Sequence, residues 1–168
     1  MKKRLFFSVC FTTAICLLFS CVNGCGSNSS RPSDLPPLEP CKITVCQEGK
    51  PLEGAVVTLI SKDTSTKYAR SSATTNASGI AELKTYGYSG VPKGTYKIVV
   101  IKSTSEGGKE ITDTSGITST RGGKVYSYVE KKYTDVLSTP LEIEIDSKEN
   151  LQSVEIGKAV HDFIGVSP

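Results

Sequence analysis

The chain has 168 residues, with 20 Lys and Arg, 17 Asp and Glu, one His, no Trp and a formal net charge of +3. Lys2, Lys3 and Arg4 account for that excess, because the chain without residues 1–20 has 17 basic and 17 acidic side chains. A neutral domain has no electrostatic surface for nucleic acid or an anionic membrane, and one histidine excludes a multi-histidine metal site. The composition therefore predicts one domain with an added segment, and no nucleic-acid partner, metal or cofactor.

Residues 1–20 have the pattern of a secretory signal peptide. The charged start is followed by an apolar stretch over 5–19, which is shorter than a membrane-spanning helix requires. It ends in Leu17-Leu18-Phe19-Ser20-Cys21, which resembles the lipobox of bacterial lipoproteins. This resemblance implies that Cys21 carries several acyl chains and anchors the protein to a membrane of the cell envelope, at the outer membrane or cell surface. Cys25 is the alternative lipidation site, and a plain signal peptide is the alternative to both.

Residues 21–40 form the next segment, which is rich in Pro and Ser. A segment of this composition cannot bury enough apolar surface to offset its ordering entropy, so we expect a flexible tether.

Cys41 and Cys46 lie in one predicted strand. Five residues of strand span about 16 Å, beyond the reach of a disulfide. Their odd spacing places them on opposite faces, with Cys41 beside the apolar residues Ile43 and Val45. We therefore expect Cys41 in the core and Cys46 on the other face.

Residues 41–158 have the pattern of an all-β domain, since short apolar runs alternate with Gly, Pro, Asn and Ser. The predicted strands are 41–47, 54–61, 66–73, 79–85, 95–103, 109–113, 124–132, 141–146 and 153–157. The alternation is clearest in Leu141-Glu142-Ile143-Glu144-Ile145-Asp146, which is typical of a half-buried antiparallel strand. About seven short strands joined by such turns indicate an antiparallel two-sheet sandwich of the transthyretin-like or immunoglobulin-like type. A small closed barrel is the alternative, and residues 159–168 are expected to be a C-terminal tail.

Three sequence blocks resemble carboxypeptidase regulatory-like domains, which have a transthyretin-like sandwich fold. The blocks are Gln47 to Leu59, Thr75-Asn76-Ala77-Ser78-Gly79 with the strand that follows it, and Val91-Pro92-Lys93-Gly94-Thr95-Tyr96 with its strand. Asn76 replaces the usual Asp, which keeps the turn chemistry and removes a charge. The resemblance implies the sandwich fold, and none of the three blocks aligns a nucleophile with a base.

No arrangement of residues predicts an enzyme. A Ser-His-Asp or Cys-His site would have to use His161, which lies in the expected tail without a nucleophile motif before it. The acidic side chains of Glu142, Glu144 and Asp146 share one strand face, where a glycosidase pair is conceivable and a solvated face is the simpler interpretation. A hydrolase is therefore only a remote alternative.

Two tyrosine pairs are the candidate binding residues. Tyr86 and Tyr88 lie in a glycine-flanked loop, and Tyr126 and Tyr128 alternate on a strand so that both rings share a face. Such rings can stack on sugars or anchor a protein, although packing within the fold is the alternative for both pairs. The polar stretch 103–123 is expected to be a mobile excursion between strands.

The sequence as a whole predicts a non-catalytic envelope lipoprotein that displays a β-sandwich for binding a carbohydrate or a protein. A purely structural spacer or assembly element of the envelope is the alternative.

Overall fold

The computed structural model describes residues 31–107, 109–112, 118–146 and 150–167, which are almost entirely strands and turns. The expected signal peptide at 1–20 and both candidate lipidation residues, Cys21 and Cys25, lie outside the described residues. In the described part of the chain, no helix combines the length and apolar character needed to cross a membrane.

The larger sheet has six antiparallel strands. Their order is β15 (Glu142–Ile145), β10 (Gly94–Ile101), β4 (Val56–Ser61), β5 (Arg70–Thr74), β7 (Lys84–Thr85) and β8 (Tyr88–Ser89). β10 lies between β15 and β4, and β-branched residues and Tyr make up most of its sequence, as expected for a central strand.

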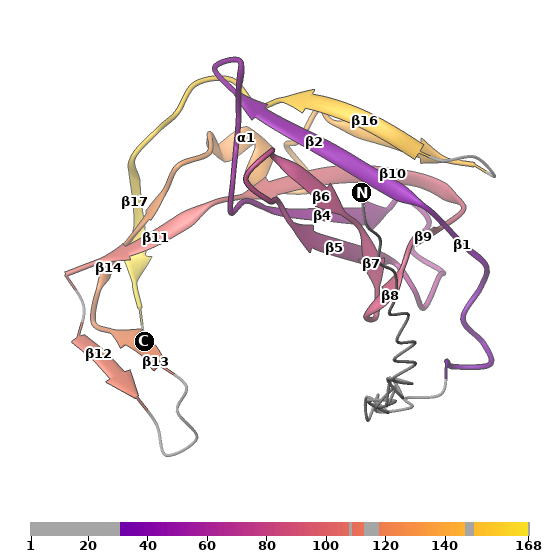
Figure 1. Ribbon diagram of the computed structural model, residues 1–168, viewed down its shortest axis with the longest axis horizontal. Coiled ribbons are helices and arrows are strands. Elements are labelled where there is room, and N and C mark those ends of the chain that lie inside the picture. The colour runs from indigo at the N-terminus through magenta and orange to yellow at the C-terminus, as the bar shows by residue number, and fades with distance from the viewer. Residues whose placement is uncertain (1–30, 108, 113–117, 147–149, 168) are drawn as a thin grey trace, which may run out of the picture. The chain divides into compact units, whose positions relative to one another are not determined.

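The second sheet is built around β2 (Cys41–Gln47), which pairs with β16 (Asn150–Glu155), β3 (Lys50–Pro51) and β6 (Ile80–Glu82). The β2–β16 pair is parallel, whereas its other pairs are antiparallel. The two sheets face one another (Figure 1) and enclose a core with Ile43 and Val45 from β2 and Leu59 and Ile98 from the larger sheet. This confirms the predicted β-sandwich, with more and shorter strands than the predicted seven.

Alternation along β2 determines which cysteine enters the core. Cys41, Ile43 and Val45 are buried, whereas Cys46 is half-buried on the opposite face. Among the described residues, both cysteines are free thiols. Burial raises the pKa of the Cys41 thiol to about 11, so Cys41 remains a neutral core residue.

A further set of strands, here called the arm, begins where β10 ends. β11 (Ser103–Glu106) pairs with β14 (Lys124–Ser127), which pairs with β17 (Asp162–Val166), while β12 (Lys109–Thr112) pairs with β13 (Thr118–Arg121). In Figure 1 these strands extend to the left of the two packed sheets. The stretch 103–123, expected to be a mobile excursion, therefore contains paired strands.

The structure also differs from the expected ends of the domain. Residues 159–168 were expected to be a tail, but Asp162–Val166 forms β17 because β14 offers it an open edge. The predicted strand 124–132 ends at Ser127, and a single helical turn, α1 (Lys131–Thr134), follows.

The N-terminal side of the domain begins before residue 41. The compact unit starts at Ser33, Leu35 is buried, and β1 (Leu38–Glu39) pairs with β9 (Val91–Pro92). The last residues of the expected 21–40 tether are thus held against the sandwich.

The turn Thr75 to Gly79 joins the two sheets. Asn76 Oδ1 accepts hydrogen bonds from the amides of Ser78 and Ile80, so the side-chain oxygen that Asn shares with Asp forms the turn. The Gly79 carbonyl accepts from the Val45 amide at 2.8 Å, which places the turn directly against β2. Gly79 has φ +73°, and a Cβ at this position would lie 2.6 Å from the Val45 carbonyl oxygen.

We expect Gly79→Ala to lower the free energy of unfolding by roughly 2–4 kcal/mol, because a left-handed alanine is strained and its Cβ meets β2. Gly49→Ala is the matched control, since Gly49 has φ +71° with no atom within 4 Å of an added Cβ, and we expect a loss of roughly 1 kcal/mol. Denaturant unfolding measures both variants. Equal losses would contradict the close approach of the turn to β2.

Glu142 of β15 links β10 and the residue after β4 at the surface of the larger sheet. Its carboxylate forms ion pairs with Lys62 Nζ at 2.7 Å and Lys97 Nζ at 2.8 Å, and Lys97 is its direct neighbour across β10 and β15. Hydrogen bonds from Lys62 and then Lys97 lower the pKa of Glu142 to about 2. On the face of this strand that was predicted to be solvated, the Glu142 carboxylate is therefore paired with two lysines.

Because the pKa of Glu142 is lower in the folded protein, its contribution to stability is present above the ordinary value of 4.5 and is lost as the pH falls toward about 2. We expect Glu142→Gln to lower the melting temperature slightly at neutral pH, with the difference from the parent vanishing near pH 2. Thermal unfolding across this pH range measures the effect. Glu144→Gln is the control, since Glu144 has no ion pair with the described residues; a pH-independent difference for Glu142→Gln would refute the assignment.

Candidate functional site

The arm brings Tyr126 and Tyr128 together with a histidine. The His161 ring stacks on Tyr126 with a centroid distance of 4.2 Å and an interplanar angle of 12°. It also meets Tyr128 edge-to-face at 5.4 Å. The two tyrosines therefore flank one imidazole, as their predicted position on a shared face allows.

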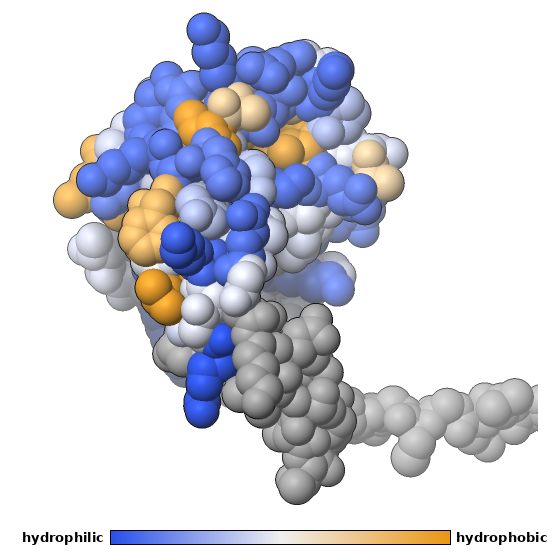
Figure 2. All heavy atoms as spheres, turned by 90° about the vertical axis from the view of Figure 1, so that its left-hand side faces the viewer, coloured by the Kyte–Doolittle hydropathy of each residue, from blue (hydrophilic) through white to orange (hydrophobic). Residues whose placement is uncertain are grey.

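A bulge in β17 adds Phe163 to this group. Val125 pairs with Gly165 and Tyr126 pairs with Phe163, so Ile164 is an extra residue between them. Phe163 consequently lies beside Tyr126, with the ring centroids 5.9 Å apart, and its side chain is 58% exposed. Figure 2, which views the molecule from the side of the arm, shows apolar side chains at the surface among hydrophilic ones.

Glu106 completes the group from the end of β11. Its Oε1 lies 3.2 Å from His161 Nε2 and accepts a hydrogen bond from the Tyr128 hydroxyl at 3.4 Å. Each of the three strands β11, β14 and β17, or a residue directly beside it, thus contributes at least one side chain to this group. We call Tyr126, Tyr128, His161, Phe163 and Glu106 the aromatic cluster.

The base of the aromatic cluster is fastened to the sandwich. Gln47, nearly buried at the end of β2, donates from Nε2 to the carbonyls of Tyr128 at 2.8 Å and Lys158 at 3.3 Å. The Tyr128 amide in turn donates to the Lys102 carbonyl at 2.9 Å. These bonds hold the backbone at Tyr128 and, through Lys158, shortly before His161.

The aromatic cluster combines an imidazole, three aromatic rings and one carboxylate. Among the described residues, His161 contacts the Glu106 carboxylate and the rings of Tyr126 and Tyr128, which orient the imidazole. The described residues also contain no group of three or more His, Cys, Asp or Glu side chains placed to hold a metal ion. Partly exposed aromatic faces with a carboxylate at their edge can stack on a flat apolar surface and accept hydrogen bonds beside it.

The other tyrosine pair lies in a different sheet. Tyr86 and Gly87 form the two-residue turn between β7 and β8, with φ values of 51° and 87°, which is the backbone of a type I′ hairpin. Tyr86 is 66% exposed and meets Tyr68 edge-to-face at 5.3 Å, whereas Tyr88 is half-buried. The two rings of this pair therefore differ in exposure, and Tyr86 contacts Tyr68.

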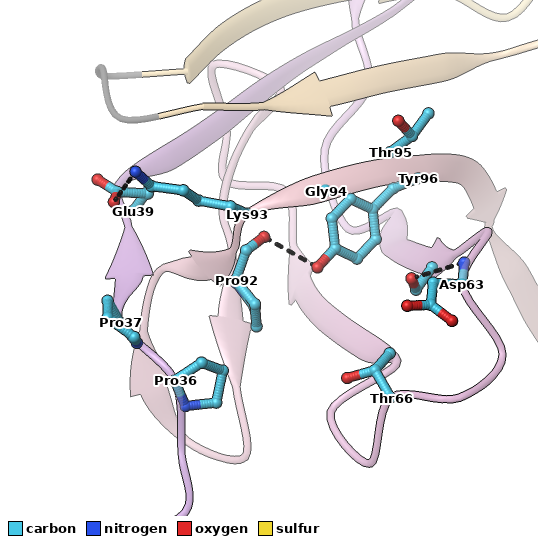
Figure 3. Close-up of a pocket in the computed structure, with 11 residues that line it drawn as sticks. Pro36, Pro37, Glu39, Asp63, Thr66, Pro92, Lys93, Gly94, Thr95 and Tyr96 are labelled. Atoms are coloured by element: carbon cyan, nitrogen blue, oxygen red, sulfur yellow. Dashed lines mark hydrogen bonds and ion pairs between the residues drawn. The ribbon is translucent and has the colours of Figure 1, made fainter.

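A pocket of about 490 Å³ lies on the sandwich (Figure 3). One wall comes from the N-terminal segment with Pro36 and Pro37, and the opposite wall comes from the β4–β5 loop with Asp63 and Thr66. The start of β10, with Tyr96, lies between them. Sequence reasoning missed this pocket because its wall lies within the expected tether; the adjacent prolines at 36 and 37 are the signal that favours a fixed segment there.

Sequence reasoning also missed three members of the aromatic cluster. His161 and Phe163 lie in the expected tail, and Glu106 lies in the expected excursion. The apolar residues after His161, Phe163-Ile164 and Val166, are the signal that could have indicated a strand.

No protein-family model and no curated protein sequence matches this chain. Among solved structures, BcpA, the major pilin subunit of Bacillus cereus, is similar over 77% of this chain, with 13% identity and a TM-score of 0.37. A variant of the same pilin carrying one substitution is similar over 80% of this chain, with 15% identity and a TM-score of 0.34. In both comparisons this chain covers 31% of the pilin chain.

Proposed function

We propose that this protein is a non-catalytic lipoprotein of the bacterial cell envelope, with a β-sandwich that presents the aromatic cluster to a carbohydrate or a protein. The observation that carries the proposal is the stack of Tyr126 on His161, with the exposed Phe163 at its edge. Rings that only completed a core would be buried, and these are open to solvent on one side.

The polar groups of the aromatic cluster support a binding role. The Tyr128 hydroxyl and His161 Nε2 both face Glu106 Oε1, so the rim carries one carboxylate whose second oxygen can accept hydrogen bonds from a sugar hydroxyl or a peptide amide. Aromatic faces and a fixed acceptor at their edge suit a pyranose ring or an aromatic side chain.

Pre-organisation also favours binding. The cluster residues come from paired strands and adjoining segments that Gln47 fastens to β2, so few side chains need to be ordered when a ligand arrives. A surface that is already ordered loses less conformational entropy on association.

The envelope location rests on the sequence. The lipobox-like Leu17 to Cys21 and the neutral composition after residue 20 support a chain that is carried outside the cytoplasm and held by acyl groups. Electrostatic attraction to the membrane would contribute little, so the lipid would be the anchor.

We expect Tyr126→Ala to weaken binding by about tenfold or more in a screen against glycans, peptidoglycan fragments and envelope proteins, because aromatic anchors contribute about 2 kcal/mol at an interface. Tyr86→Ala is the matched control, since Tyr86 is exposed in another sheet. Circular dichroism checks that both variants fold. If Tyr86→Ala abolished binding and Tyr126→Ala did not, the site would lie at Tyr86 instead. If no glycan, peptidoglycan fragment or envelope protein bound, the spacer function would be favoured.

We expect Cys21→Ala to release the protein from the membrane fraction, because the acyl chains provide the anchor. Fractionation of cells expressing the parent and the variant measures the change, and Cys25→Ala serves as the control. Retention of Cys21→Ala in the membrane with release of Cys25→Ala would transfer the anchor to the second cysteine; retention of both would refute lipid anchoring.

A further inference from the structure

The pocket beside the N-terminal segment has an apolar side made largely of proline rings. Pro36, Pro37 and Pro92 line one side, and the Tyr96 ring lies across from them (Figure 3). The Tyr96 hydroxyl donates to the Pro92 carbonyl at 2.9 Å, and Tyr96 is only 2% exposed, so it closes the floor of the pocket and leaves Pro36 and Pro37 as the open apolar surface. These apolar surfaces suit the aliphatic chain of a ligand.

Asp63 supplies a fixed negative charge to the same pocket. Its Oδ1 accepts hydrogen bonds from the Ser65 amide at 2.9 Å and the Ser65 hydroxyl at 2.7 Å. The Asp63 amide donates to Ser61 Oγ at 3.1 Å, which also fixes the backbone. No donor among the described residues occupies Oδ2, so this oxygen is available to a ligand.

The remaining charges of the pocket compensate one another. Lys93 Nζ lies 3.7 Å from Glu39 Oε1, so the basic side chain is paired with the second acidic one. The lining therefore has an excess of one negative charge, located at Asp63. A cation is favoured over an anion for this reason.

The wall of prolines is held in place without a ligand. Asp34 accepts a hydrogen bond from the Tyr68 hydroxyl at 2.6 Å and pairs with Lys67 at 2.5 Å, while Leu35 is buried. The β1–β9 pair fixes the segment on the other side of Pro36 and Pro37. The pocket is thus formed in advance, which lowers the entropic cost of binding.

We propose that this pocket binds an alkylammonium group, with the aliphatic stem against the proline rings and the ammonium at Asp63 Oδ2. Thr66 lines the same wall as Asp63, and its Oγ1, which accepts from the Tyr68 amide at 3.3 Å, keeps a second lone pair for the ammonium. The group can belong to a lysine side chain of a protein or to a free aliphatic amine. This site shares no residue with the aromatic cluster and stands independently of the proposed function.

Titration of the full-length chain in detergent micelles tests the proposal, with amide chemical shifts around Asp63 as the readout. The probes are N-acetyl-lysine N-methylamide and 1,5-diaminopentane, with N-acetyl-norleucine N-methylamide as the analogue that keeps the stem and lacks the ammonium. We expect saturable binding of at least one amine, and at least about tenfold weaker binding of the norleucine derivative, since hydrogen bonds to charged groups are strong. Preference for the lysine derivative or for the diamine identifies the source of the group.

Asp63→Asn is the decisive variant. Its Oδ1 can still accept from Ser65, as Asn76 Oδ1 does from Ser78, so the loop is expected to keep its shape. We expect amine affinity to fall by about tenfold or more when the negative charge is removed. Asp135→Asn is the matched control, because Asp135 Oδ1 accepts from the Leu137 amide in the same geometry outside the pocket.

Three results would overturn the proposal. These are the absence of saturable binding by either amine, equal binding of the norleucine derivative, and unchanged amine affinity in Asp63→Asn. None of them bears on Tyr126, so a failure here is distinguishable from a failure of the aromatic cluster.

Discussion

The peptide groups of Val45 are the point at which the domain is held together. The Val45 amide donates to the Gly79 carbonyl at 2.8 Å, and its carbonyl accepts from the Leu52 amide at 2.9 Å. Its side chain is fully buried, and its backbone lies opposite Val154 of β16. The turn after β5, the connection before β4 and the C-terminal part of the sandwich are therefore all fixed to one residue of β2. Because backbone donors and acceptors cannot remain unpaired in a core, these segments can adopt few other arrangements.

The sequence was sufficient to predict those strands whose residues alternate between apolar and polar. β2 has the predicted bounds and the predicted buried face, and Tyr96 enters the core with its hydroxyl at an edge, because each has apolar neighbours two residues away. The arm has no such pattern. Its strands 103–106 and 118–121 consist mostly of Ser and Thr, and β17 exposes Phe163 and Val166, so local polarity does not distinguish them from loops. The parallel β2–β16 pair likewise depends on the course of the whole chain, which no local signal reports.

The candidate site could be predicted only in part for a related reason. Tyr126 and Tyr128 share a face because of their spacing along one strand, and spacing is visible in a sequence. Glu106 and His161 are 55 residues apart and meet only because β11 and β17 flank β14. The bulge at Ile164 then selects Phe163 as the neighbour of Tyr126. Such a displacement by one residue is decided by pairing in three dimensions, so the sequence could not specify the ring that completes the cluster.

The docked N-terminal segment has a mechanical consequence. A pulling force applied to the chain before Ser33 reaches the Asp34 contacts with Lys67 and Tyr68 first, and then the two-residue pair of β1 and β9. The next element, β2, is paired with β16 over Cys41–Cys46 and with β6 over Lys42–Thr44, so it resists a much larger load. Tension would therefore peel Pro36 and Pro37 from the pocket while the sandwich stays intact. The domain thus contains a short, weak link in series with a strong one, and the pocket wall is part of the weak link.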